Sequence, residues 1–209
     1  MAVSFDLFGT LVERVDAGAG DPAARVAAEL ATRDVAVPDD WAAAYRERHI
    51  DAPEGAEVPL PAHVSAALAS RGVDAPGNAA RRAVVAAFDP EIRTRDGAVD
   101  AVAAAREHGP VALCSNCSVP ELVGRTLVRS ELSRGDFDAV VSSVGCGWRK
   151  PTAAMFETTA RQLDVEPADL VHVGDDPRTD GGIEALGGRF VDVTDVPLTE
   201  LADELGWSG

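Results

Sequence analysis

A chain of 209 residues, 46% of them apolar, is long enough for one domain with a substantial core or for a core with a smaller insert. The formal net charge is −16, from 35 acidic and 19 basic residues, which argues against a nucleic-acid-binding protein because phosphate contacts need a basic face. No run approaches the ~20 apolar residues of a membrane span, and no secretory signal is evident at the N-terminus. We therefore expect a cytoplasmic protein that binds neither nucleic acid nor membrane.

The basic residues are 18 arginines and one lysine, Lys150. An acidic chain with few lysines and many alanines suggests a halophilic host, although a GC-rich genome gives a similar composition. In either case the charge bears on solubility rather than on catalysis. Cys114 and Cys117 have CxxC spacing, but no second such pair accompanies them, so we expect these two and Cys146 to be free thiols.

The first predicted element is a short apolar strand at residues 2–6, which ends on Asp6 and precedes a Gly-Thr turn. Residues 21–88 then carry a helical pattern in four segments, at 21–34, 39–49, 61–72 and 77–88. Asp or Pro opens several of these segments and Gly follows the third, as is typical of helix ends. This part of the chain therefore predicts a small all-helical unit.

After residue 95 helices and apolar strands alternate. The predicted helices are 96–109, 119–132, 150–165 and 180–188, and the predicted strands are 111–115, 138–143, 170–175 and 189–193. Such alternation indicates a parallel, Rossmann-like sheet covered by helices on both faces. The opening strand belongs to this sheet, so we expect an α/β core of residues 1–12 and 96–209 with a helical cap, 13–95, inserted after the first strand.

The predicted strands end on polar residues, namely Asp6, Ser115, Ser142–Ser143 and Asp175. Parallel sheets bind ligands at the carboxyl ends of their strands. Two carboxylates at neighbouring strand ends repel each other, and a divalent cation such as Mg²⁺ removes that penalty. Either aspartate alone could simply cap a turn or a helix, but together with Ser115 and Lys150 they favour a site.

Lys150 carries a signal of its own. It lies in GCGWRKPTAAMF, directly before a proline that starts a predicted helix, and Arg149 beside it already supplies positive charge. A lysine at this position suggests a need for a compact ammonium rather than a planar guanidinium. Chance placement of a single lysine is the alternative.

These segments resemble the four motifs of the haloacid dehalogenase (HAD) superfamily of hydrolases. Asp6 in FDLFGTL resembles the nucleophilic aspartate of the first motif, and Ser115 in LCSN resembles the oxyanion-holding hydroxyl of the second. Lys150 in RKP resembles the third motif, and Asp175 in GDDPRTD resembles the Mg²⁺-binding aspartate of the fourth. The order and spacing match over nearly all of the α/β part, and the helical segment resembles the family's inserted cap.

The resemblance implies a hydrolase that acts on a small-molecule substrate. A carboxylate, here Asp6, attacks phosphorus or carbon and forms a covalent intermediate that water cleaves. It also implies Mg²⁺ held by Asp6, Asp175 and the main-chain carbonyl of Phe8. Beside the catalytic residues, the expected substrate-binding residues are Phe8, Gly9, Thr10 and Asn116.

Phe8 departs from the family pattern, because most family phosphatases carry a second aspartate there that protonates the leaving group. Such general acid–base help is worth roughly 10²–10⁴-fold. One interpretation is a phosphatase whose leaving group needs little protonation, such as an acyl or aryl phosphate, or whose acid comes from the cap. A second is a 2-haloacid dehalogenase, since halide needs no acid and Asn116 suits that branch. A third is a ligand-binding module without turnover. The intact Gly174-Asp175-Asp176 sequence favours the metal-dependent phosphatase.

Other polar residues have weaker signals. Asp176 and Asp180 could tune the metal, pair with Lys150 or cap the helix near 180. Arg46 and Arg48 could reach a substrate from the cap, although solvated surface charge is the more ordinary role. His172, within an apolar strand, is expected to be a packed residue.

Overall fold

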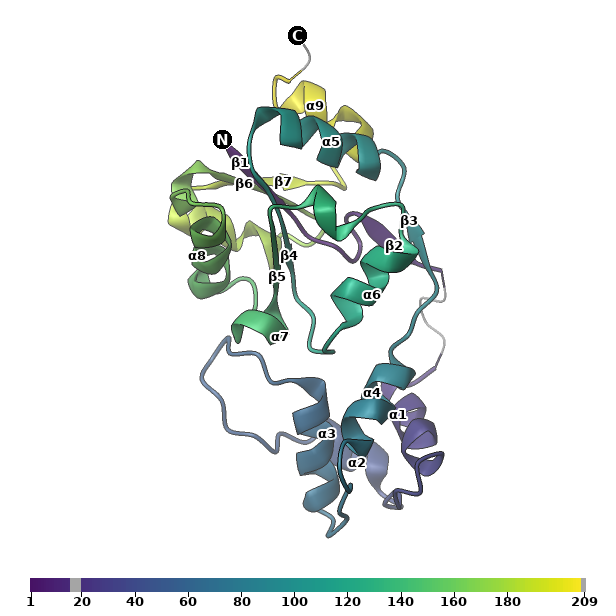
Figure 1. Cartoon of the computed structure of the whole chain (residues 1–209). Helices are drawn as coiled ribbons and strands as arrows, with labels where there is room; N and C mark the ends of the chain where they lie inside the picture. Colours follow the sequence, from purple (N-terminus) through teal and green to yellow (C-terminus); the bar gives the residue numbers. More distant parts are fainter. Residues whose placement is uncertain (16–19, 208–209) are drawn as a thin grey trace.

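A computed structural model describes residues 1–15 and 20–207, and in this part of the chain a parallel sheet has the strand order β5-β4-β1-β6-β7 (Figure 1). The strands are β1 (Ala2–Phe5), β4 (Val111–Ser115), β5 (Ala139–Ser142), β6 (Leu170–Gly174) and β7 (Arg189–Asp192). β1 lies at the centre, where Phe5 is paired with Leu113 on one side and Val173 on the other. The predicted α/β fold with a parallel sheet is confirmed.

Helices cover both faces of the sheet because successive strand residues point to opposite faces. Val3 and Phe5 belong to the same buried cluster as residues of α5 (Ala98–His108), α6 (Leu122–Arg129) and α9 (Leu201–Glu204). Ala2 packs on the other face, with Phe156 of α8 (Ala153–Gln162). β1, β4 and β6 are buried along their whole length, which explains why their sequences are apolar except for Ser4, Ser115 and His172.

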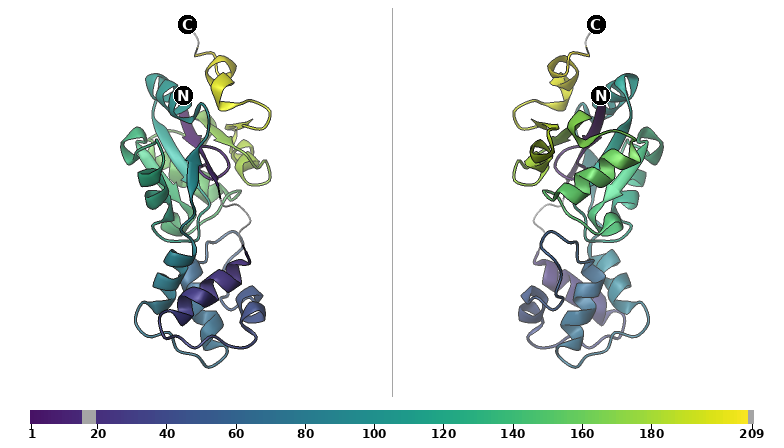
Figure 2. Two further views of the ribbon diagram at one scale, coloured as in Figure 1. Left: turned by 90° about the vertical axis from the view of Figure 1, so that its right-hand side faces the viewer. Right: turned by 90° about the vertical axis from the view of Figure 1, so that its left-hand side faces the viewer.

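The cap consists of α1 (Pro22–Ala31), α2 (Trp41–Arg46), α3 (Leu60–Ala69) and α4 (Ala79–Ala87). The Asp21 carboxylate accepts from the N–H of Ala23 at the start of α1, and the Trp41 indole of α2 donates to the Ala23 carbonyl. Figures 1 and 2 show these helices beyond the edge of the sheet where the strands end. No helix within the described residues is both long and apolar enough to span a membrane.

Several elements differ from those expected. β2 (Val12–Arg14) and β3 (Ile92–Thr94) form an antiparallel ladder where the chain enters and leaves the cap. Residues 143–146 form a short helix, α7 (Ser143–Cys146), rather than ending a strand. The predicted helix 180–188 is the 3₁₀ helix η3 (Asp180–Leu186). Three further 3₁₀ turns, at η1 (Arg134–Asp136), η2 (Pro167–Asp169) and η4 (Leu198–Glu200), lie among the described residues.

The predicted boundary between residues 12 and 13 falls within β2, and the one between 95 and 96 follows β3; both stay predictions. Residues 16–19 of the predicted cap and 208–209 of the predicted core lie outside the described residues. All three cysteines are free thiols, and Cys114 and Cys117 are buried. Burial raises the pKa of the Cys114 thiol to about 11, so this thiol stays protonated at neutral pH.

Candidate active site

Asp6 and Lys150 meet at the carboxyl end of β1. The Lys150 ammonium donates to Asp6 Oδ1 at 2.8 Å and to the Cys114 carbonyl at 2.8 Å. The side chains are 1% exposed for Lys150 and 10% exposed for Asp6. Residues 144 positions apart therefore form a buried ion pair at the sheet edge.

Asp180 is the second carboxylate bound to Lys150. Its Oδ1 accepts from Lys150 Nζ at 2.5 Å and contacts His172 Nε2 at 3.0 Å. Its Oδ2 accepts from the main-chain N–H groups of Asp175 and Asp176, both at 3.1 Å. Of the roles expected for Asp180, pairing with Lys150 is the one that the structure contains, whereas Asp176 pairs with the exposed Arg178.

His172 links this cluster to β1. Its Nδ1 lies 2.8 Å from the Ser4 hydroxyl, and Asp180 lies at its Nε2. Because a carboxylate accepts, the consistent tautomer carries its proton on Nε2, and Nδ1 accepts from Ser4. His172 also packs edge-on against Phe156, so the expected packing role holds, but its hydrogen bonds were not foreseen.

Charge and burial oppose each other in this cluster. Burial alone would lower the pKa of Lys150, but the Asp6 and Asp180 carboxylates raise it above its usual value. Burial also opposes ionisation of Asp180, yet His172 and Lys150 hold the pKa of that carboxyl well below its usual range. The pKa of Asp6 is raised by burial, which Lys150 offsets only in part. Burial lowers the pKa of His172, helped by Lys150, which favours the neutral ring.

Gly9 and Thr10 hold Asp175, which directly follows β6. The Thr10 hydroxyl donates to Asp175 Oδ1 at 3.1 Å. Gly9 has φ +94°, and a Cβ added there would lie 2.3 Å from Asp175 Oδ2. The turn after Asp6 therefore packs directly onto the second strand-end carboxylate, and only glycine fits that approach. Burial raises the pKa of Asp175, and the Thr10 hydrogen bond opposes that rise.

Ser115 is the last residue of β4, on the other side of β1 from β6, and Asn116 directly follows it. The Ser115 hydroxyl is buried and has no hydrogen-bond partner among the described residues, which is unusual for a buried polar atom. The Asn116 side chain accepts from the Lys150 main-chain N–H at 2.8 Å and donates to the Lys150 carbonyl at 3.0 Å. Asn116 thus fixes the backbone that carries the ammonium.

A cavity of about 250 Å³ lies between these loops and the cap. Its lining residues are mainly apolar: Phe8, Arg14, Leu60, Phe88, Pro90, Asn116, Cys117, Ser118, Val119 and Leu122. Phe8 comes from the loop after Asp6, and Leu60 from the first residue of α3. Among the described residues, no carboxylic acid or histidine lines this cavity, so the described part of its wall supplies no such proton donor to a group bound there.

The oxygen donors at the strand ends suit a hard cation in kind. Asp6 and Asp175 follow the adjacent strands β1 and β6 and present carboxylate oxygens, which Mg²⁺ prefers. No group of three or more His, Cys, Asp or Glu able to hold a metal occurs in residues 1–15 and 20–207. A magnesium ion at these aspartates would therefore need main-chain, water or substrate oxygens as its other ligands.

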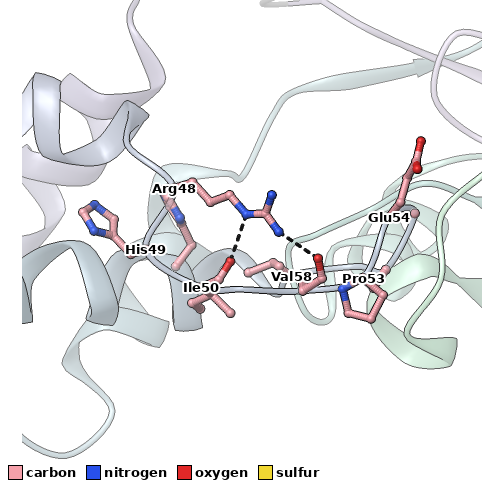
Figure 3. Close-up of a pocket in the computed structure, with 10 residues that line it drawn as sticks. Arg48, His49, Ile50, Pro53, Glu54 and Val58 are labelled. Atoms are coloured by element: carbon pink, nitrogen blue, oxygen red, sulfur yellow. Dashed lines mark hydrogen bonds between the residues drawn. The ribbon is translucent and has the colours of Figure 1, made fainter.

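A larger hollow of about 500 Å³ is lined by the connection between α2 and α3 and by His63 of α3 (Figure 3), and neither Asp6 nor Asp175 lines it. Arg48 at its rim donates to the carbonyls of Ile50 and Ala52 within its own loop. Arg46 pairs with Asp21 at the surface. The structure thus gives both cap arginines local partners and places neither in the Phe8 cavity.

Solved structures of three enzymes are similar to the whole chain. A 2-haloacid dehalogenase from Pseudomonas syringae pv. Tomato has 18% identity over 98% of this chain and 97% of its own, with a TM-score of 0.69. A predicted phosphoglycolate phosphatase from Haemophilus somnus has 13% identity over 98% and 97%, with a TM-score of 0.60. A HAD family enzyme from Bacteroides thetaiotaomicron, in complex with magnesium and inorganic phosphate, has 14% identity over 91% and 92%, with a TM-score of 0.60.

At these identities the structural likeness establishes the fold alone. No curated protein matches the chain. The family evidence comes from the sequence itself, which matches the model of haloacid dehalogenase-like hydrolases over residues 1–187. That match includes all four predicted motifs, and the chain therefore belongs to the haloacid dehalogenase-like hydrolase family.

Proposed function

We propose that the protein is a magnesium-dependent phosphatase that acts on a small phosphorylated metabolite through an aspartyl intermediate. The observation that supports this most is the buried Lys150–Asp6 pair with an unpartnered Ser115 hydroxyl on the adjacent strand. A buried hydroxyl without a partner is costly unless a ligand completes its hydrogen bonding. A phosphoryl oxygen is such a ligand.

In the proposed reaction an Asp6 carboxylate oxygen forms a bond to phosphorus, and the bond to the leaving-group oxygen breaks with its electron pair. Lys150 holds Oδ1 of the nucleophile and offsets its charge, and Ser115 donates to a phosphoryl oxygen. Water then cleaves the aspartyl phosphate and restores the carboxylate. Magnesium, bound by Asp6, Asp175 and the Phe8 carbonyl, would stabilise the negative charge of the phosphoryl group.

The wall beside Phe8 constrains the leaving group. Phenylalanine donates no proton, and none of the described residues that line the cavity beside it is a carboxylic acid or a histidine. Glu57, a buried carboxylate of the cap, contacts Ser143 and does not line this cavity. We therefore favour acyl or aryl phosphates, whose leaving groups depart without general-acid help.

A 2-haloacid dehalogenase is the second candidate. Phe8 and the apolar cavity favour it, because halide leaves without a proton and a small apolar acid suits such walls. The aspartate at 175, held by Thr10, favours the metal-dependent phosphatase instead.

The deciding experiment compares wild type with Asp6→Asn on a panel of acyl, aryl and alkyl phosphates and on 2-haloacids. Each assay is run with Mg²⁺ and with chelator, at low and high salt. The phosphatase proposal predicts phosphate release that needs Mg²⁺ and is lost in the variant. Chelator-resistant halide release would instead identify a dehalogenase. Release of neither product by wild type would favour the ligand-binding module over both enzymes. Activity that survives in the variant does not arise at this site.

A further inference from the structure

Residues 55–60, the end of the connection from α2 and the first residue of α3, make main-chain hydrogen bonds to the core. The main-chain N–H of Arg149 donates to the Gly55 carbonyl at 2.9 Å, and that of Glu57 donates to the Gly147 carbonyl at 2.9 Å. The N–H of Leu60 donates to the Ser118 carbonyl at 2.8 Å. This segment therefore fastens the cap to the loop after β4 and to the loop that leads to Lys150.

Glu57 is the buried charge of this segment. Its side chain is 1% exposed, and the Ser143 hydroxyl donates to its Oε2. Its Oε1 has no hydrogen-bond partner among the described residues, and the Arg149 guanidinium lies 3.8 Å away. Burying a carboxylate is unfavourable unless its oxygens are hydrogen-bonded, so the hydrogen bond from Ser143 is an important contact of the Glu57 side chain.

Ser143 connects Glu57 to the loop that follows Ser115. The Ser143 hydroxyl donates its one hydrogen bond to Glu57, and its oxygen accepts a hydrogen bond from the Cys117 N–H at 2.8 Å. Cys117 is two residues beyond Ser115 and directly follows Asn116, which holds both main-chain groups of Lys150. Two consecutive hydrogen bonds through Ser143 thus connect Glu57 to residues 115–117, which carry the Ser115 hydroxyl and include the Asn116 side chain that holds the Lys150 backbone.

We propose that Glu57 is a positioning residue that couples the seating of segment 55–60 on the core to the geometry of residues 115–117, acting through Ser143. When the segment is seated, Ser143 is held with a lone pair facing Cys117. When Glu57 is removed, the Ser143 hydroxyl loses its acceptor and the Cys117 anchor weakens. The effect of this coupling on catalysis rests on the proposed hydrolase function, whereas the coupling itself does not.

Amide hydrogen exchange at Cys117, measured by NMR, tests the coupling without a substrate. Loss of the hydrogen bond from Ser143 to Glu57 should weaken the hold of Ser143 on the Cys117 N–H. From the strength of a hydrogen bond to a carboxylate, we expect the Cys117 amide to exchange roughly tenfold faster. We expect that increase in Glu57→Ala and in Ser143→Ala, and no further increase in the double variant because both act on the same two hydrogen bonds. Glu57→Gln keeps an acceptor and should restore slow exchange, and Glu54→Ala, an exposed glutamate of the same loop, is the matched control.

Turnover supplies the second measurement. In Glu57→Ala we expect kcat to fall roughly tenfold with a smaller change in KM, and Glu57→Gln to recover most of kcat. Unchanged Cys117 exchange in Glu57→Ala, or additive effects of the two single variants, would overturn the coupling. If Glu57→Ala does not fold, Glu57→Leu takes its place, because leucine fills the buried position but removes the acceptor of the Ser143 hydroxyl; unchanged Cys117 exchange in that variant would overturn the coupling. A protein without hydrolase activity that shows this exchange pattern would refute the proposed function and leave the coupling intact.

Discussion

Replacing Lys150 with methionine tests the buried cluster through stability, without knowledge of the substrate. The variant keeps an unbranched side chain that is shorter only by the terminal atom, but it leaves the Asp6 and Asp180 carboxylates without the ammonium that both contact. Removing one partner of a buried ion pair costs about 3–5 kcal/mol, a large part of the total stability of a domain. We therefore expect Lys150→Met to lower the free energy of unfolding by about that amount at pH 7.5, measured by urea denaturation and circular dichroism.

The pH dependence of this loss has a definite sign. Burial already raises the folded-state pKa of Asp6, and loss of the cation raises it further. A carboxyl whose folded pKa lies above its unfolded value costs stability increasingly as the pH rises past the unfolded value of about 3.9. The difference between variant and wild type should therefore be largest at pH 7.5 and shrink toward pH 4.

The matched control is Arg178→Met, because Arg178 pairs with Asp176 but is 88% exposed. Its urea midpoint should stay close to that of wild type, since exposed pairs contribute little. A loss below about 1 kcal/mol in Lys150→Met, or an equal loss at pH 4 and pH 7.5, would refute the view that Lys150 is the charge that makes this cluster possible.

Three further predictions concern single residues. The folded-state pKa of Asp180 is depressed, so the stabilisation that it contributes is present at neutral pH and is lost as the pH falls below the unfolded carboxyl value. In Asp180→Asn the free energy of unfolding, measured between pH 3 and 7, should therefore fall less steeply toward acid than in wild type. Gly9→Ala places a Cβ 2.3 Å from Asp175 Oδ2 at φ +94°, so we expect a stability loss of about 1–3 kcal/mol in urea denaturation, and an unchanged midpoint would contradict the close packing. Phe8→Asp introduces the missing acid, and under the proposed function it should raise kcat/KM for alkyl phosphates by roughly 10²-fold while changing aryl phosphates less; an equal effect on both would count against the leaving-group argument.

Much of the fold could be predicted from the sequence because its strong elements have strong local signals. The runs VALCS and LVHVG are buried on both faces, so they are apolar except for Ser115 and His172. β2 and β3 were missed because VER and IRT are three residues long and show no alternation that separates strand from loop. Residues 180–188 look helical, but two consecutive glycines weaken the α-helix, and the segment forms 3₁₀ turns.

The site was predictable where a polar residue ends an apolar strand, as at Asp6, Ser115 and Asp175. Contacts between distant positions were not, since nothing local links His172 to Ser4, which is 168 residues away in the chain. His172 looks like a packed residue because it is one, and its hydrogen bonds become visible only when β1 and β6 are paired. Glu57 lies in a proline-rich connection without periodicity, so its burial follows from the tertiary structure alone.

The β2–β3 ladder has a consequence for changes in the cap. Val12 is paired with Thr94, and the Arg95 N–H donates to the Leu11 carbonyl at 2.9 Å, so the two connections to the cap are tied together where they leave the core. The cap is therefore a loop whose two ends are fixed to each other at the core. Lengthening such a loop between its fixed ends adds little entropic cost. A change confined to the cap helices would therefore leave unchanged the register of β1 and β6, the strands that Asp6 and Asp175 follow.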